Sequence, residues 1–132
     1  MTRDAAEILR DAHTIAIVGA SADPWRPSQG VMRYLLDAGY RCIPVNPGCD
    51  EVLGVPAVAS LAEIDEPIDL VDVFRRPERC AEHAREAVAA GAGALWLQLG
   101  IVSAEARSIA EAAGLDYVED ACTKVVHTRA LR

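Results

Sequence analysis

Short apolar runs alternate along the chain with segments in which apolar residues recur at helical spacing. The runs are rich in Val, Ile and Leu, which is typical of strands buried on both faces. We predict five such strands, at residues 15–18, 41–45, 68–74, 94–99 and 115–118. The segments between them predict helices at residues 3–12, 28–37, 77–90, 104–113 and 122–130, with a long connection over residues 48–59 and a capped turn at 60–64.

This alternation indicates an α/β fold, because each parallel crossover is right-handed and needs about the length of a helix to return. We predict a single Rossmann-like domain over residues 1–132, a doubly wound, parallel five-stranded sheet with helices on both faces. With the strands numbered along the chain, we expect the order 3-2-1-4-5. That order reverses beside the first strand, which predicts a ligand crevice over the carboxyl ends of strands one and four.

The first strand and the helix after it have the features of a phosphate site. Gly19 ends the strand, the small residues Ala20 and Ser21 follow, and Ser28 stands where the N-cap of the helix is expected. A glycine lets backbone N–H groups approach an anion, and a helix start adds unpaired N–H groups and a positive dipole end. The dinucleotide fingerprint G-x-G-x-x-G is absent, since Ser21 and Pro24 hold the positions of its later glycines. A glycine that only makes a tight turn is the alternative interpretation.

Other strand ends meet at the same crevice by topology, and they narrow the choice of nucleotide. NAD binding requires Asp or Glu at the end of the second strand, where this chain has Asn46, so NAD is disfavoured. Arg75 and Arg76 follow the third strand and are candidates to pair with phosphate as planar forks, the alternative being solvated arginines beside a turn. Phe74 is a candidate to stack on adenine, with packing in the sheet core as its alternative.

Charge and composition narrow the ligand class further. The formal net charge of −7 disfavours general nucleic-acid binding, which requires a basic surface, so an anionic ligand needs local help from helix termini and arginines. The four cysteines have irregular spacing and indicate neither a disulfide framework nor a metal site. No apolar segment has the length of a membrane span or of a signal core, so we expect a cytoplasmic protein without membrane contact. From the small size and the hydrophobic content of 52% we expect a homodimer.

Four motifs occur together in one order and spacing: I-V-G-A-S, G-Y-R-C-I-P-V-N-P, V-D-V-F-R-R-P-E and A-L-W-L-Q-L-G-I. In combination they resemble the small stand-alone CoA-binding domain proteins, which are similar to the N-terminal CoA-binding domain of the succinyl-CoA synthetase alpha subunit. The resemblance extends from about residue 14 to residue 127. It implies a Rossmann-like fold and coenzyme A as the cofactor.

The resemblance also implies which residues bind the phosphates of CoA. It puts Gly19, Ala20 and Ser21 at the phosphate loop, and it matches Ser28 and Gln29 to the start of the following helix, beside those phosphates. The loop between Ser21 and Ser28 is longer than the tight loop of the synthetase. The synthetase has a lysine where this chain has Cys49, so the resemblance leaves the missing charge to one of the arginines, Arg26, Arg75 or Arg76.

For the rest of the ligand, the resemblance implies three groups of contacts. It puts the adenosine end beside Val45, Asn46 and Pro47. It puts the pantetheine arm near Leu97, Gln98 and Leu99, and the thiol close to Cys122. A mixed disulfide between Cys122 and CoA is a hypothesis for this thiol, and a buried structural thiol is the favoured alternative.

The expected function is binding rather than catalysis. Nothing in the chain resembles the ligase domain that supplies the phosphorylated histidine of the synthetase, so thioester formation does not follow. We expect a carrier, sensor or regulatory module for CoA or an acyl-CoA. The alternatives are an NAD(P)-dependent oxidoreductase, for which the crevice lacks an acid or base apart from Asp23, and the CoA-binding half of a ligase with a separate partner chain. A Rossmann-like scaffold that acts only through protein contacts is a further alternative.

Overall fold

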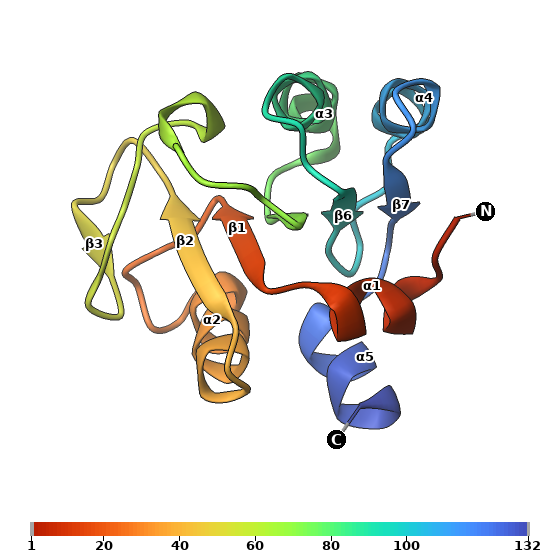
Figure 1. The fold of residues 1–132 in the computed structure, drawn as a ribbon. Helices are drawn as coiled ribbons and strands as arrows, with labels where there is room; N and C mark the ends of the chain where they lie inside the picture. Colours follow the sequence, from red (N-terminus) through yellow and green to blue (C-terminus); the bar gives the residue numbers. More distant parts are fainter. Residues whose placement is uncertain (1, 132) are drawn as a thin grey trace.

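In a computed structural model, which describes residues 2–131, one parallel sheet separates two layers of helices (Figure 1). The strands of this sheet are β1 (Thr14–Val18), β2 (Arg41–Val45), β5 (Leu70–Val73), β6 (Ala94–Leu97) and β7 (Asp116–Val118). One face carries α3 (Pro77–Ala89) and α4 (Ala104–Ala112), and the other carries α1 (Ala5–Asp11), α2 (Pro27–Asp37) and α5 (Thr123–Ala130). The predicted α/β class, the parallel five-stranded sheet and the helices on both faces are confirmed.

The connection after β2 has more structure than the sequence predicts. A two-stranded antiparallel hairpin, β3 (Glu51–Val52) and β4 (Val55–Pro56), lies in the segment expected to be a loop. The 3₁₀ helix η1 (Leu61–Glu63) follows with a capping box on Ser60, as the predicted capped turn requires.

The strand order differs from the predicted one. The sheet has the order β2-β1-β5-β6-β7, so the third of its strands lies between the first and the fourth, not outside the second. Pro44 explains why β2 is an edge strand: its carbonyl faces outward and accepts from Val58 N at 3.0 Å, and its nitrogen has no hydrogen to donate to a further strand. The order therefore reverses between β1 and β5, and the ligand crevice belongs over their carboxyl ends.

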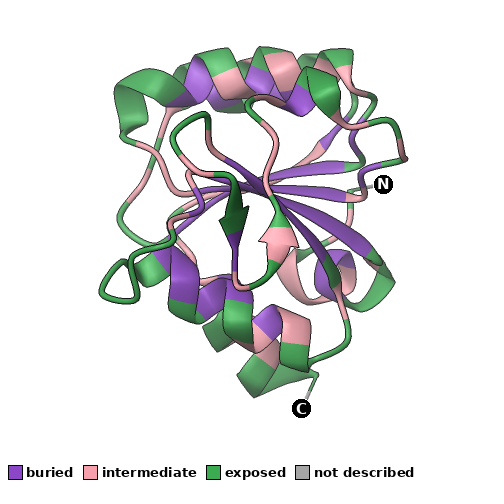
Figure 2. Ribbon diagram, turned by 90° about the vertical axis from the view of Figure 1, so that its left-hand side faces the viewer, coloured by how far each residue is buried: buried purple, intermediate pink, exposed green. Residues whose placement is uncertain are grey.

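The sheet is buried on both sides, as the continuous apolar runs predict (Figure 2). Alternate residues of each strand enter one of two cores, so that Val18 and Leu97 pack on the α3 side while Ile17 and Trp96 pack on the α2 side. Trp96 is fully buried, and its Nε1 donates to Ala121 O at 2.8 Å, which fixes the chain just before α5. No helix within residues 2–131 has both the length and the apolar character needed to cross a membrane.

Candidate ligand-binding cleft

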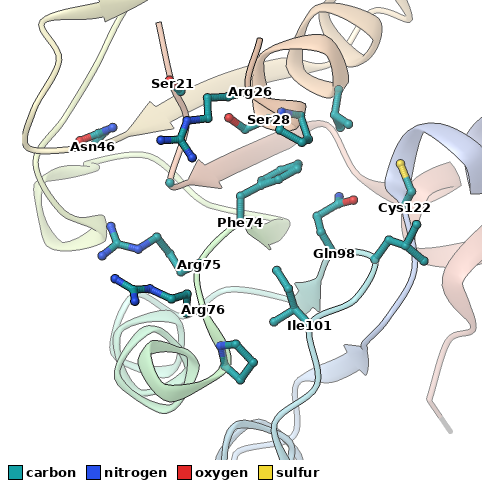
Figure 3. A pocket seen from close by; sticks show the side chains of 15 residues that line it. Ser21, Arg26, Ser28, Asn46, Phe74, Arg75, Arg76, Gln98, Ile101 and Cys122 are labelled. Carbon is teal, nitrogen blue, oxygen red and sulfur yellow. The ribbon is translucent and has the colours of Figure 1, made fainter. Parts of the chain in front are cut away.

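A cleft of about 790 Å³ opens over the carboxyl ends of β1, β5 and β6 (Figure 3). This volume is within the range of ligand pockets, roughly 300–1,000 Å³. Its walls come from the loops after β1, β2, β5 and β6 and from the starts of α2, α3 and α5. The predicted crevice is therefore present. The sequence predicts it over the first and fourth strands of the sheet, β1 and β6, and the observed strand order centres it on β1 and β5.

Gly19 makes the turn at the base of the cleft, and two features require glycine there. Its φ is +85°, in the left-handed region that other residues avoid. A Cβ atom at this position would lie 2.7 Å from Phe74 O and 2.9 Å from Arg75 Cδ. The loops after β1 and β5 are therefore in direct contact, with the Phe74 carbonyl and the Arg75 side chain beside the Gly19 turn.

Polar side chains hold the loops of the cleft in shape. Asn46 Nδ2 donates to Ala20 O at 2.7 Å, and Asn46 Oδ1 accepts from Gly48 N at 2.7 Å, so this amide joins the loops after β1 and β2. Ser21 Oγ accepts from Asp23 N at 3.0 Å and has no acceptor for its own hydrogen within residues 2–131. The Ser21 hydroxyl is thus available to donate to a ligand.

The helices that begin at the cleft lack side-chain caps. Arg26, Arg76 and Cys122 are the N-cap residues of α2, α3 and α5, and none of these side chains accepts from the first turn. By contrast, α1 and α4 are capped by Asp4 and Ser103, neither of which lines the cleft. Arginine at a helix start opposes the helix dipole. Pro27 and Pro77 have no N–H, and Gln29 and Arg79 donate to the N-cap carbonyls, so the second position of α2 and of α3 keeps the free N–H. An anion in the cleft would satisfy these N–H groups and reverse this unfavourable electrostatics.

Three arginines give the cleft a positive wall in an acidic protein. Arg26, Arg75 and Arg76 all line it, and their guanidinium groups gather on one side of it (Figure 3). Within the described part of the chain, no carboxylate lies within ion-pair distance of Arg26 or Arg75, and Arg76 reaches only the exposed Glu78, at 4.0 Å. The lining residues contain no Asp, Glu or His. The site is therefore suited to an anionic ligand.

A buried polar network lies under the opposite side of the cleft. Asp72, in the middle of β5, is fully buried and has a pKa raised by burial to about 7, an effect that hydrogen bonds from Gln98 and Thr123 partly oppose. Gln98 Nε2 lies 2.7 and 2.9 Å from the two Asp72 oxygens and 2.8 Å from Thr123 Oγ1. Thr123 Oγ1 donates in turn to Asp72 Oδ2 at 3.1 Å. The network joins β5, β6 and the first residue of α5.

Most of the predicted site residues line the cleft: Gly19, Ser21, Arg26, Ser28, Asn46, Phe74, Arg75, Gln98, Leu99 and Cys122. Five do not. Ala20, Val45 and Leu97 are buried in the two cores, and the Gln29 amide donates to Ala22 O at 2.9 Å below the surface. Pro47 is exposed outside the cleft lining. Contacts from these residues to a ligand remain predictions.

Two details of the sequence analysis need correction. Ser28 is not the N-cap of α2, because Arg26 caps the helix and Pro27 occupies its first position, where proline is favoured. Ser28 instead lies inside the first turn, 3% exposed, with no hydrogen-bond partner for its hydroxyl among residues 2–131. Asp23 does not line the cleft, since its carboxylate accepts from Trp25 N in the exposed loop.

Sequence reasoning missed several residues of the cleft. Pro27, Val31, Pro77 and Ile101 line it, and of these only Pro77 and Ile101 belong to the quoted motifs. Asp72 does have a signal in the sequence, because it is the one charged residue inside the apolar run L-V-D-V-F. A charge there is expected only where buried partners satisfy it.

Comparison with known proteins gives a consistent result. A model of the CoA binding domain family matches residues 13–128. The chain is 47% identical over 121 residues to the uncharacterised protein YneT of Bacillus subtilis, an alignment that covers 92% of this chain and 90% of YneT. A hypothetical protein from Pyrococcus horikoshii OT3 has a structure similar to this one, with a TM-score of 0.95 and 40% identity over 98% of this chain and 91% of that one.

A more distant relative has a printed activity. Part of the chain is 32% identical over 57 residues to the ADP-forming acetate–CoA ligase of Methanocaldococcus jannaschii. The match covers 43% of this chain and 8% of the ligase. Only a small part of that enzyme is therefore similar to the chain described here.

Proposed function

The chain belongs to the CoA-binding domain family, related to the CoA-binding part of acyl-CoA ligases, and from this we propose that it binds coenzyme A or an acyl-CoA in the cleft. The protein then acts as a carrier, sensor or regulatory module that holds the ligand without converting it. The main support for this proposal is that the helices that begin at the cleft have no side-chain caps. These helix starts meet where Arg26 and Arg75, which have no carboxylate partner among residues 2–131, line the wall.

The phosphates are assigned to the charged side of the cleft. The Gly19 N–H already donates to Val45 O, so the pyrophosphate accepts from the backbone N–H groups that follow it and from that of Ser28 in the first turn of α2. Ser21 and Ser28 add hydroxyl donors. Arg26 and Arg75 pair with the phosphate oxygens as planar forks. Each such charge-assisted hydrogen bond stabilises a complex by roughly 1.5–3 kcal/mol.

The uncharged parts of the ligand then have two directions available. The adenosine end lies toward Asn46 and the bend after β2. Phe74 lines the cleft while packing against the core, and it offers an aromatic face there. The pantetheine arm extends away from the arginines, toward Gln98, Leu99 and Cys122. This arrangement puts the negative phosphates beside the positive arginines. It puts the less polar pantetheine arm in the less polar half of the cleft.

Two alternative functions make different demands on the site. An oxidoreductase needs a general acid or base at the reacting atoms, and the residues that line the cleft supply neither a carboxylate nor an imidazole. The CoA-binding half of a ligase needs a separate catalytic chain, which would be recovered with this protein on purification. We favour the binding module because the positive wall and the helix starts need only an anionic ligand.

Calorimetry with CoA, dephospho-CoA, NAD and NADP, run side by side on the full chain, tests the proposal. We expect CoA to bind most tightly, because only it joins a pantetheine arm to the complete set of phosphates. An affinity for NAD or NADP above that for CoA would support the oxidoreductase instead. Absence of heat with CoA at millimolar concentration would overturn the proposal.

A further inference from the structure

The uncharged half of the cleft is the side away from the three arginines, at Gln98 and Cys122. Gln98 presents one free polar atom, its amide oxygen, to this half. The side chain is 4% exposed and lines the cleft, while both hydrogens of Nε2 are taken up by Asp72 and Thr123 below. A carboxylate can only accept hydrogen bonds, so the amide nitrogen must face Asp72 whenever that residue is ionised. The oxygen Oε1 is then turned the other way, on the side of Cys122 (Figure 3), and has no donor among residues 2–131.

Protonation of Asp72 removes this requirement. A neutral carboxyl group gains an O–H that needs an acceptor, and two groups are within reach: Thr123 Oγ1, and Gln98 Oε1 once the amide turns over about its last torsion. Such terminal torsions are broad and roughly two-fold, so both orientations are sterically available. The turned amide directs Nε2 into the cleft. Both protonation states thus leave the buried network hydrogen-bonded, but they offer opposite groups to a ligand.

Among the groups packed around it, the Asp72 carboxyl is the one that we expect to titrate between pH 5.5 and pH 8. Its neighbours across the sheet are Ile17 and Trp96, and the buried face of α2 has no ionisable side chain. Cys42 on β2 has a pKa raised to about 12 by burial and, secondarily, by Asp72, so it stays neutral. Cys122 precedes Thr123 at the start of α5. Burial raises the pKa of Asp72 to about 7, which brings its titration into the physiological range.

We propose that Asp72 is a positioning residue for Gln98 and that its protonation state decides whether the cleft prefers a free thiol or an acylated one. When Asp72 is ionised, Gln98 Oε1 accepts from the S–H of CoA. When Asp72 is protonated, Gln98 Nε2 donates to the carbonyl oxygen of a thioester. The inference rests on the proposed function, because it assumes that a CoA-type ligand extends its arm to this half of the cleft.

The test compares CoA and acetyl-CoA on the full chain at pH 5.5 and pH 8. The two ligands share every phosphate, so the titration of these groups cancels in the ratio of their dissociation constants. We expect the preference for CoA over acetyl-CoA to be roughly threefold to tenfold greater at pH 8 than at pH 5.5, the size of one hydrogen bond gained or lost. Both ligands binding with a pH-independent ratio would overturn the inference.

Variants separate positioning from general structural effects. Asp72→Asn has no titrating proton, so its ratio is expected to be the same at both pH values. Gln98→Met keeps the size of the side chain without its amide and is expected to give the same flat ratio, which covers the case that Asp72→Asn fails to fold. Asp69→Asn, at the opposite end of the same strand, is the matched control and is expected to retain the pH dependence of the wild type.

Nuclear magnetic resonance of the free protein keeps this test distinct from that of the proposed function. If neither ligand binds, the proposed function fails, and the side-chain amide signals of Gln98 decide on the network alone. A nuclear Overhauser contact between the Gln98 amide protons and the Thr123 side chain that is present at pH 8, is lost at pH 5.5 in the wild type and persists at both pH values in Asp72→Asn upholds the reversal of the amide. Signals that stay constant from pH 5.5 to pH 8 in the wild type overturn it.

Discussion

The wild-type protein should lose stability as the pH rises, and the variant Asp72→Asn should not show this loss. Burial raises the pKa of this carboxyl from 3.8 to about 7, so between these values the folded protein retains a proton that the unfolded chain has released. The stabilisation that this proton provides is complete below the unfolded pKa and is lost as pH rises through the folded pKa. Asparagine is close in size and has no such proton, so the variant should lack this term.

The size of the effect follows from the two pKa values. One pKa unit corresponds to about 1.4 kcal/mol, so the difference between 3.8 and about 7 corresponds to about 4 kcal/mol over the whole range. About 2 kcal/mol of this falls between pH 5.5 and pH 8, a window above the isoelectric point of about 4.9. We therefore expect the unfolding free energy of Asp72→Asn, relative to wild type, to rise by about 2 kcal/mol across that window.

Urea unfolding followed by circular dichroism measures this difference at several pH values. Subtracting the wild-type profile cancels the exposed carboxylates Asp11 and Glu66, whose arginine hydrogen bonds lower their pKa values in both proteins. Asp69→Asn again serves as the control, since its carboxylate accepts from backbone N–H groups at the other end of β5. A difference between Asp72→Asn and wild type that does not change with pH would refute the reasoning.

Three further predictions concern the cleft itself. Arg26→Gln and Arg75→Gln should each weaken CoA binding about tenfold in calorimetry and reduce its salt dependence. The control Arg129→Gln, at an exposed position of α5, should not change the affinity, and equal affinities of all three variants would contradict the phosphate assignment. Gly19→Ala should lower stability by about 2–4 kcal/mol in urea, from the left-handed φ and the approach to the neighbouring carbonyl, and a loss below about 1 kcal/mol would be inconsistent with that geometry. Oxidised CoA should form one mixed disulfide detectable by intact mass, as the Cys122 thiolate displaces one CoA thiol; no adduct, or an equal adduct on Cys122→Ala, would exclude it.

The elements of the fold were predictable because their signals are local. Strands buried on both faces leave continuous apolar runs in the sequence. The sequence predicts Ser103 as the N-cap of a helix, and it is the N-cap of α4 in the structure. The lateral order of the strands was not predictable from these runs, because periodicity does not show which strand lies beside which. Pro44 is a local signal in the sequence for the edge strand.

The site was predictable where strand ends define it and unpredictable where contacts join distant residues. Gly19 and Gln98 follow strands, so topology alone placed them at the cleft. The partnership of Gln98 with Asp72 and Thr123 joins residues at least 25 positions apart, and no sequence spacing reveals it. The correction to Ser28 has a local cause, since Pro27 was the better marker of the helix start.

The outer side of β2 has a consequence for how copies of this chain can meet. An incoming strand would find no hydrogen offered by Pro44, and Pro44 O and Asn46 N are already bonded to Val58. Extension of one sheet into the next, a common route to fibrous aggregates, is therefore blocked at that margin. Two copies that form the homodimer we expect should join through helices or through the opposite margin, at β7.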